Sequence, residues 1–143
     1  MESTKTPNAR AKIFVLDDSP TGLAYLKMIL EAEGYLVSAF ESPLGISREI
    51  LRQKPDLVIV DVNMPSITGD KICRLIRAAL PHRSVGVMLH SSLPESDLHD
   101  LAQDCGADSY VPKSRDPRTL CRAVHRQLFG YIQPTTLRAA QAC

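Results

Sequence analysis

The chain lacks the long hydrophobic runs that a membrane protein needs. Its longest apolar stretches have the length of a β-strand, far below the roughly 20 apolar residues of a membrane-spanning helix. The polar start at residues 1–5 also lacks the apolar core of a signal peptide. An excess of charge is missing too, because 17 basic and 16 acidic residues leave a formal net charge of +1. We therefore expect a cytoplasmic protein with no overall attraction to nucleic acid or to a membrane.

Paired cysteines are missing as well. The chain has no CxxC pair and no histidine at zinc-site spacing, and its four cysteines are widely scattered: Cys73, Cys105, Cys121 and Cys143. This spacing argues against a structural metal site. Cys73 and Cys105 fall on the apolar sides of segments with helical periodicity. We expect both to be small buried hydrophobic residues in a reducing compartment.

Five short apolar runs alternate with five segments of helical periodicity. The runs predict β-strands at residues 12–17, 35–40, 56–61, 84–90 and 109–112. The periodic segments predict helices at residues 20–33, 43–53, 69–80, 94–105 and 116–129. The alternation predicts one α/β domain at residues 12–129 with a doubly wound, flavodoxin-like (βα)5 fold. Residues 1–11 and 130–143 are expected to be tails.

Two irregular strands predict the order of the parallel sheet. Ser38 interrupts the apolar run at residues 35–40, and Pro112 removes a backbone donor from residues 109–112, so both strands are expected at sheet edges. The order 2-1-3-4-5 places them there. It also makes the first and third strands neighbours where the order reverses, and ligands bind outside the carboxyl ends of strands at such a point.

Charged side chains stand at these carboxyl ends. Asp17 and Asp18 follow the first strand, Asp61 ends the third, and Lys113 follows the fifth. Three acids and a lysine at one edge favour Mg²⁺ together with a phosphoryl group. Residues 17–20 (DDSP) alone are also typical of a helix start, and they lack the glycine-rich turn of a dinucleotide-binding domain. Asp61 is the stronger indication, because an acid ending an apolar strand costs solvation unless a cation meets it.

Two further positions extend the predicted site. A turn containing Asn63 and Pro65 bends the backbone so that a carbonyl near Asn63 can face the acids. Ser91 ends the fourth strand, where its hydroxyl and the Lys113 ammonium can contact phosphate oxygens. Alone, a serine here more often caps a helix and a lysine more often lies on the surface, but their position beside the strand of Asp61 favours the site.

Together these residues resemble the receiver domain of two-component response regulators. The resemblance covers about residues 12–129 and rests on Asp17-Asp18, Asp61-x-Asn63-Met64-Pro65, Gly69, Ser91-Ser92, Gly106-Ala107, Tyr110 and Lys113. It implies that Asp61 accepts a phosphoryl group from a histidine kinase or a phosphotransfer protein. It also implies that Mg²⁺ is held by Asp17, Asp18, Asp61 and the backbone carbonyl of Asn63.

The resemblance further implies a two-state switch. Lys113 and Ser91 would contact phosphate oxygens, and Tyr110 would swing inward to fill the space that Ser91 leaves as it moves. The surface formed by the last two helices and the strand between them would then signal to an effector protein. Two positions depart from the family pattern: Ser114 stands where proline is usual, which excludes a cis Lys-Pro bond, and Ser91 replaces the commoner threonine.

The last two predicted helices carry opposite charges. The acidic residues of helix 94–105 are Glu95, Asp97, Asp100 and Asp104. The arginines at and before the final helix are Arg115, Arg118, Arg122 and Arg126. Such stripes are usually solvated faces. The alternative is a homodimer in which these two helices of one copy meet those of another across a two-fold axis.

Two other functions stay open. A receiver-like scaffold that accepts no phosphate would be expected if the metal-binding acids were lost, but they are present. A phosphatase with an aspartyl nucleophile usually has a second acid two residues later, where this chain has Asn63. We expect a signalling switch that turns over no external substrate. It should act through a protein partner, because the tail after residue 129 is too short for a DNA-binding domain.

Overall fold

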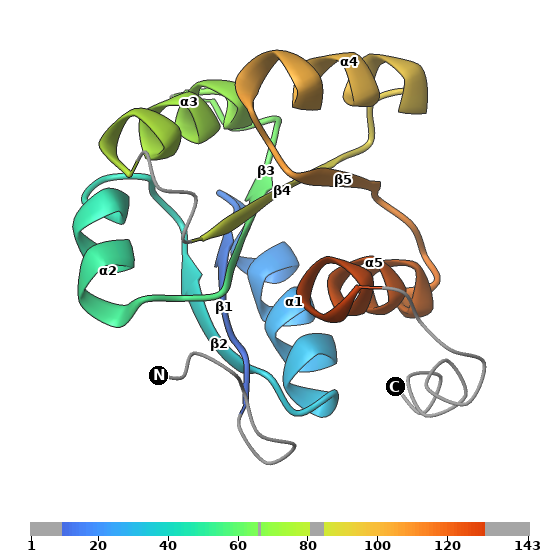
Figure 1. The fold of residues 1–143 in the computed structure, drawn as a ribbon. Helices are drawn as coiled ribbons and strands as arrows, with labels where there is room; N and C mark the ends of the chain where they lie inside the picture. The colour runs from blue at the N-terminus through green and yellow to red at the C-terminus, as the bar shows by residue number, and fades with distance from the viewer. Residues whose placement is uncertain (1–9, 66, 81–84, 131–143) are drawn as a thin grey trace.

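The computed structural model of the protein describes residues 10–65, 67–80 and 85–130 (Figure 1). Its strands are β1 (Lys12–Leu16), β2 (Leu36–Phe40), β3 (Leu57–Asp61), β4 (Gly86–Ser91) and β5 (Ser109–Pro112). Its helices are α1 (Pro20–Ala32), α2 (Ile46–Gln53), α3 (Gly69–Ala79), α4 (Glu95–Cys105) and α5 (Pro117–Phe129). Strands and helices alternate along the chain, as the sequence predicts.

The strands form one parallel sheet in the order β2-β1-β3-β4-β5. This order confirms the predicted doubly wound α/β fold and places β2 and β5 at the edges. All of β3 is buried, because helices cover both faces of the sheet. Helices α1 and α5 lie on one face, and α2, α3 and α4 lie on the other (Figure 1).

The alternation of side chains along β3 divides the core in two. Val58 and Val60 pack with α2, α3 and α4, whereas Leu57 and Ile59 pack with α1 and α5. Asp61 is the next residue and the last of the strand. Its backbone is therefore fixed by the most enclosed strand of the molecule.

Two helices begin with a side-chain cap followed by proline. The Ser19 hydroxyl accepts the Gly22 N–H at 3.1 Å, directly before α1. A carboxylate oxygen of Asp116 accepts the Arg118 N–H at 3.0 Å, directly before α5. Residues 17–20 are thus a helix start as well as the location of two acids, because the cap is Ser19 and neither acid is used for it.

The predicted start of the second helix is wrong. It was expected at residue 43, but α2 begins at Ile46, because Gly45 has a φ of 77° that a right-handed helix does not contain. The fourth strand runs from Gly86 to Ser91, and residue 84 lies outside the described residues. The other described ends of strands and helices lie within one residue of the predicted ends. The predicted tails lie almost wholly outside the described residues. Within the described segments, no helix is long and apolar enough to cross a membrane.

Candidate functional site

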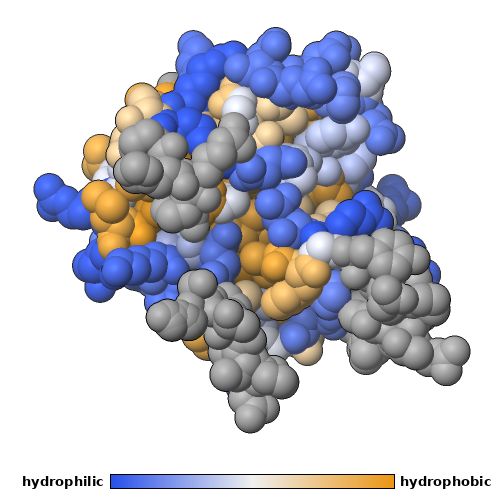
Figure 2. Space-filling view, in the orientation of Figure 1, coloured by the Kyte–Doolittle hydropathy of each residue, from blue (hydrophilic) through white to orange (hydrophobic). Residues whose placement is uncertain are grey.

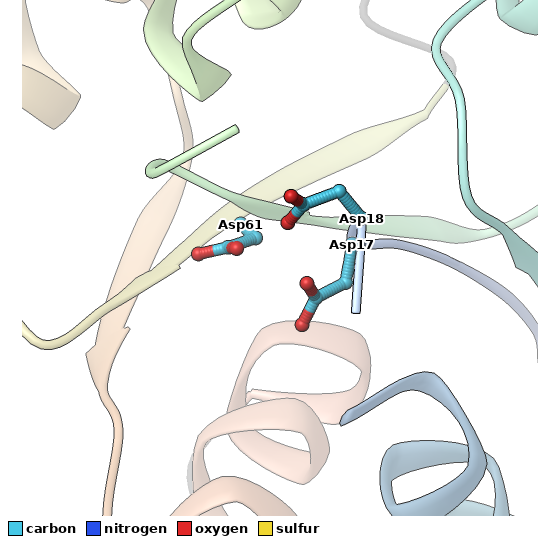
Figure 3. Close-up of side chains that lie close together, drawn as sticks. All are labelled: Asp17, Asp18 and Asp61. Atoms are coloured by element: carbon cyan, nitrogen blue, oxygen red, sulfur yellow. The ribbon is translucent and has the colours of Figure 1, made fainter. Parts of the chain in front are cut away.

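Three carboxylates meet at the carboxyl edge of the sheet. Asp17 and Asp18 follow β1, and Asp61 ends the neighbouring strand β3 (Figure 3). One oxygen from each side chain lies within 4.8 Å of the others. Among the described residues this is the one group of three acids, histidines or cysteines that is close enough to share a metal ion. A site built from oxygen ligands alone fits Mg²⁺ or another hard cation.

Burial makes this arrangement electrostatically costly. The side chains of Asp17 and Asp61 are each only 4% exposed, whereas Asp18 is exposed. Burial raises the pKa of Asp17 above its usual value; a hydrogen bond from Ser19 opposes this shift, and the charge of Asp61 adds to it. The Lys113 ammonium lies 3.3 Å from Oδ1 of Asp61. One lysine balances one carboxylate, so a divalent cation would neutralise the remaining negative charge.

The backbone around the acids fixes their orientation. Oδ1 of Asp17 accepts the Ser19 N–H at 3.0 Å, and the Asn63 N–H donates to Oδ1 of Asp61 at 3.3 Å. The chain then returns to start α3 so closely that a Cβ on Gly69 would lie 2.6 Å from the Asp61 carbonyl oxygen. Only glycine fits there without moving the backbone that carries Asp61.

The pairing of β4 with β5 joins Ser91 to Lys113. The Lys113 N–H donates to the Ser91 carbonyl at 2.8 Å. The Ser91 side chain is fully buried and its hydroxyl oxygen accepts the Leu93 N–H at 3.1 Å, which leaves the hydroxyl proton for another acceptor. Ser91 does not cap α4, whose N-cap residue is Pro94. All described peptide bonds are trans, including the one between Lys113 and Ser114.

Two residues that the sequence does not predict lie beside the acids. A Cβ on Gly22 would lie 3.0 Å from Oδ2 of Asp17, so the first turn of α1 packs directly against that carboxylate. His90 pairs with Asp61 in the sheet register and is buried, with no described hydrogen-bond partner for its Nδ1 atom. Burial, and then the charge of Lys113, lower the pKa of His90 to about 4, so the ring is neutral. A single glycine and a single histidine give no sequence pattern that would identify them.

Tyr110 lies on β5 beside a groove. Its half-buried ring meets the His99 ring of α4 edge-on, with centroids 5.6 Å apart and planes at 79°. The groove has a volume of about 660 Å³, and its walls include Glu95 from α4 and Arg122 and Arg126 from α5. The Nε atom of Arg122 is buried without a described hydrogen-bond partner. The groove thus has an unsatisfied donor in its wall.

Comparison with known proteins identifies the family. A family model described as the response regulator receiver domain matches residues 13–125. The chain belongs to this family. Transcriptional regulatory protein CreB of Escherichia coli (strain K12) is 31% identical to this receiver domain over 119 residues, which are 83% of this chain and 51% of CreB. The chain spans about half the length of the first curated relatives it matches.

Solved structures agree with this assignment. A response regulator receiver domain from Clostridium thermocellum has a TM-score of 0.72 at 31% identity, covering 82% of this chain and 94% of that one. Chemotaxis protein CheY4 of Vibrio cholerae has a TM-score of 0.77 at 23% identity, covering 84% and 100%, and is similar in fold. The resemblance found in the sequence is therefore confirmed. This receiver domain is a module of two-component signal transduction.

The buried acids predict a stability change that depends on pH. An acid whose folded-state pKa is raised stabilises the fold below its unfolded-state pKa, and this contribution is lost as pH rises through the folded-state pKa. Without divalent cations, Asp17→Asn should therefore raise the unfolding free energy at about pH 7, by on the order of 1 kcal/mol. The gain should shrink toward about pH 4.

Thermal unfolding in a chelator at several pH values measures this effect. Asp18→Asn is the matched control, because Asp18 is exposed and its substitution should change stability less. Equal stability of Asp17→Asn and wild type across this pH range would contradict the proposed cost of burying Asp17.

Proposed function

We propose that this receiver domain accepts a phosphoryl group on Asp61 from a phosphohistidine of a histidine kinase or phosphotransfer protein. The observation that carries the proposal is the pair of buried carboxylates, Asp17 and Asp61, faced by the single ammonium of Lys113. Asp17, Asp18, Asp61 and the Asn63 carbonyl would hold Mg²⁺. That ion supplies positive charge that makes an approaching phosphoryl anion tolerable beside the acids.

The hydrogen bonds around Asp61 favour one of its oxygens as the nucleophile. Both described donors, the Lys113 ammonium and the Asn63 N–H, lie on Oδ1. Oδ2 is then the oxygen that forms the new bond to phosphorus as the bond from phosphorus to the donor histidine breaks. Lys113 stays close enough to pair with an oxygen of the transferred group.

The paired strands β4 and β5 would link a phosphoryl group on Asp61 to the protein surface. The Ser91 hydroxyl would donate a hydrogen bond to a phosphoryl oxygen. The Ser91 backbone carbonyl already accepts a hydrogen bond from the Lys113 N–H. Tyr110 lies on the adjacent strand with its ring half-buried against His99. Movement of Ser91 would open space for the Tyr110 ring and so reshape the groove between α4, β5 and α5. An effector protein would read this change.

The alternative functions have less support. An aspartyl phosphatase needs a general acid where this chain has Asn63. A scaffold that accepts no phosphate would have no use for two buried acids that repel one another. CreB is named as a transcriptional regulator, but this chain matches only 51% of it, and the mixed charge of the groove favours a protein partner over nucleic acid. We therefore propose that the domain is a signalling switch that turns over no external substrate.

Phosphoryl transfer can be tested with a small donor. Wild-type protein incubated with acetyl phosphate and Mg²⁺ should gain one phosphoryl group, because Asp61 is the one acid paired with Lys113 among the described residues. Intact-mass spectrometry measures the gain. Asp61→Asn should gain none, and chelation of Mg²⁺ should reduce wild-type labelling by at least about tenfold. Asp97→Asn, an exposed acid on α4, is the control and should be labelled like wild type. Labelling of Asp61→Asn to the wild-type extent would refute the proposal.

We propose further that the phosphorylated domain forms a homodimer through α4 and α5. The surface over α4 is hydrophilic (Figure 2), and the acids Asp97, Asp100 and Asp104 are all exposed. Of the four arginines on the basic side, Arg115 precedes α5, and Arg118 pairs with the cap of its own helix, Asp116. Two arginines remain in the groove wall, Arg122 and Arg126. They offer positive charge to an acidic α4 of a second copy.

Charge reversal tests the dimer. Sedimentation with beryllofluoride and Mg²⁺ should show a dimer for wild type, a monomer for Arg126→Glu, and partial recovery for Glu95→Arg combined with Arg126→Glu. Arg48→Glu, on exposed α2 surface, should dimerise normally. A wild-type protein that stays monomeric under these conditions rules out the dimer while leaving phosphorylation of Asp61 untouched.

A further inference from the structure

Two cysteines from different helices meet in the core beneath α3 and α4. Cys73 lies in α3 and Cys105 is the last residue of α4, 32 positions later. Their exposed fractions are 0% and 4%, so the burial that the sequence predicts is confirmed. The Cys73 thiol donates to the Cys105 carbonyl oxygen, with sulfur and oxygen 3.4 Å apart, and the Cys105 thiol donates to the Ala102 carbonyl oxygen at 3.7 Å. Sequence spacing gave no sign of this contact.

The two thiols differ in acidity. The interaction with Cys105, and then burial, raise the pKa of Cys73, whereas the interaction with Cys73 lowers the pKa of Cys105. The positive charge of Arg74 also lowers the pKa of Cys105. Since the thiolate is the reactive form of cysteine, the more acidic thiol, Cys105, should react first.

We propose that Cys73 and Cys105 are a redox-sensitive pair that forms a reversible disulfide, joining α3 to α4, when the protein meets a peroxide. Both thiols are reduced in this structure, and no third cysteine among the described residues belongs to the same core cluster. Most disulfides in reducing compartments are of this transient, responsive kind. The bond itself does not depend on the proposed phosphorylation.

The reaction balances in two steps. The Cys105 thiolate sulfur attacks one oxygen of hydrogen peroxide, the O–O bond breaks, and the departing hydroxide takes up a proton to become water. The Cys73 sulfur then attacks the resulting sulfenic sulfur of Cys105. The S–S bond forms, the S–O bond breaks, and the Cys73 proton leaves with the hydroxide as water. Two thiols lose two electrons and the peroxide gains them, and a small dithiol reverses the change.

Burial sets the rate of this reaction. Peroxide reaches Cys105 only when the last turn of α4 opens, and helix ends open more readily than helix centres. This turn stops at Gly106, which has a φ of 84°. A disulfide would close this opening and hold α4, one wall of the Tyr110 groove, against α3. Its effect on signalling, unlike the bond, rests on the proposed function.

Peptide mapping tests the pair directly. In protein carrying Cys121→Ala and Cys143→Ser, hydrogen peroxide should produce an intramolecular disulfide between Cys73 and Cys105 that dithiothreitol removes. Hydrogen exchange in the last turn of α4 should become slower in the oxidised form. In Cys73→Ala, dimedone should trap a sulfenic acid at Cys105. In Cys105→Ala, Cys73 should react at least about tenfold more slowly, because its thiol is the less acidic of the two.

The outcomes separate this proposal from the phosphorylation of Asp61. Asp61→Asn keeps both cysteines, so its disulfide should form at the wild-type rate. A folded wild-type protein whose two thiols stay free in peroxide, while the same protein oxidises in guanidinium, would overturn the redox proposal and leave phosphorylation standing. A disulfide only between separate molecules would overturn it as well. Cys121, buried in α5 on the opposite face, should stay reduced in the otherwise unaltered chain.

Discussion

The buried carboxylates of Asp17 and Asp61 repel one another, and the rest of the molecule holds them in place against that repulsion. Their strands are neighbours in the sheet, so the acids cannot separate without breaking the pairing of β1 with β3. One lysine, Lys113, lies 3.3 Å from Asp61 and offsets part of the charge. This excess of negative charge is suited to a divalent cation, which is why we propose that the site binds Mg²⁺ together with a phosphoryl group.

The fold connects the charged site to the surface around β5 and α4. Ser91 and Lys113 end neighbouring strands and share a backbone hydrogen bond of 2.8 Å. Tyr110 lies on β5, the edge strand that ends one residue before Lys113. Its ring packs against His99 of α4. Helix α4 in turn contacts α3 where the Cys73 thiol donates to the Cys105 carbonyl oxygen. The proposed switch element therefore lies between the proposed phosphoryl site and the pair formed by Cys73 and Cys105.

The parts of this account that sequence could predict are those with a repeating or terminal pattern. The continuous apolar run of β3 predicted a buried central strand, and acids and a lysine at strand ends predicted where charge would gather. The start of α2 was mispredicted because a left-handed Gly45 looks like any other glycine in a sequence. Gly22, His90 and the contact of Cys73 with Cys105 depend on how separate elements pack, and no local pattern encodes such a distance.

Calorimetric titration of the protein with Mg²⁺ tests the central claim most directly, because it asks whether the strand-end acids act as one cation site. The account predicts a single site in wild type, with affinity at least about tenfold weaker in Asp18→Ala and weaker again as pH falls and the acids take up protons. Asp97→Ala, an exposed acid on α4, should bind like wild type. Equal Mg²⁺ affinity in wild type and Asp18→Ala, or no binding to wild type at all, would contradict it.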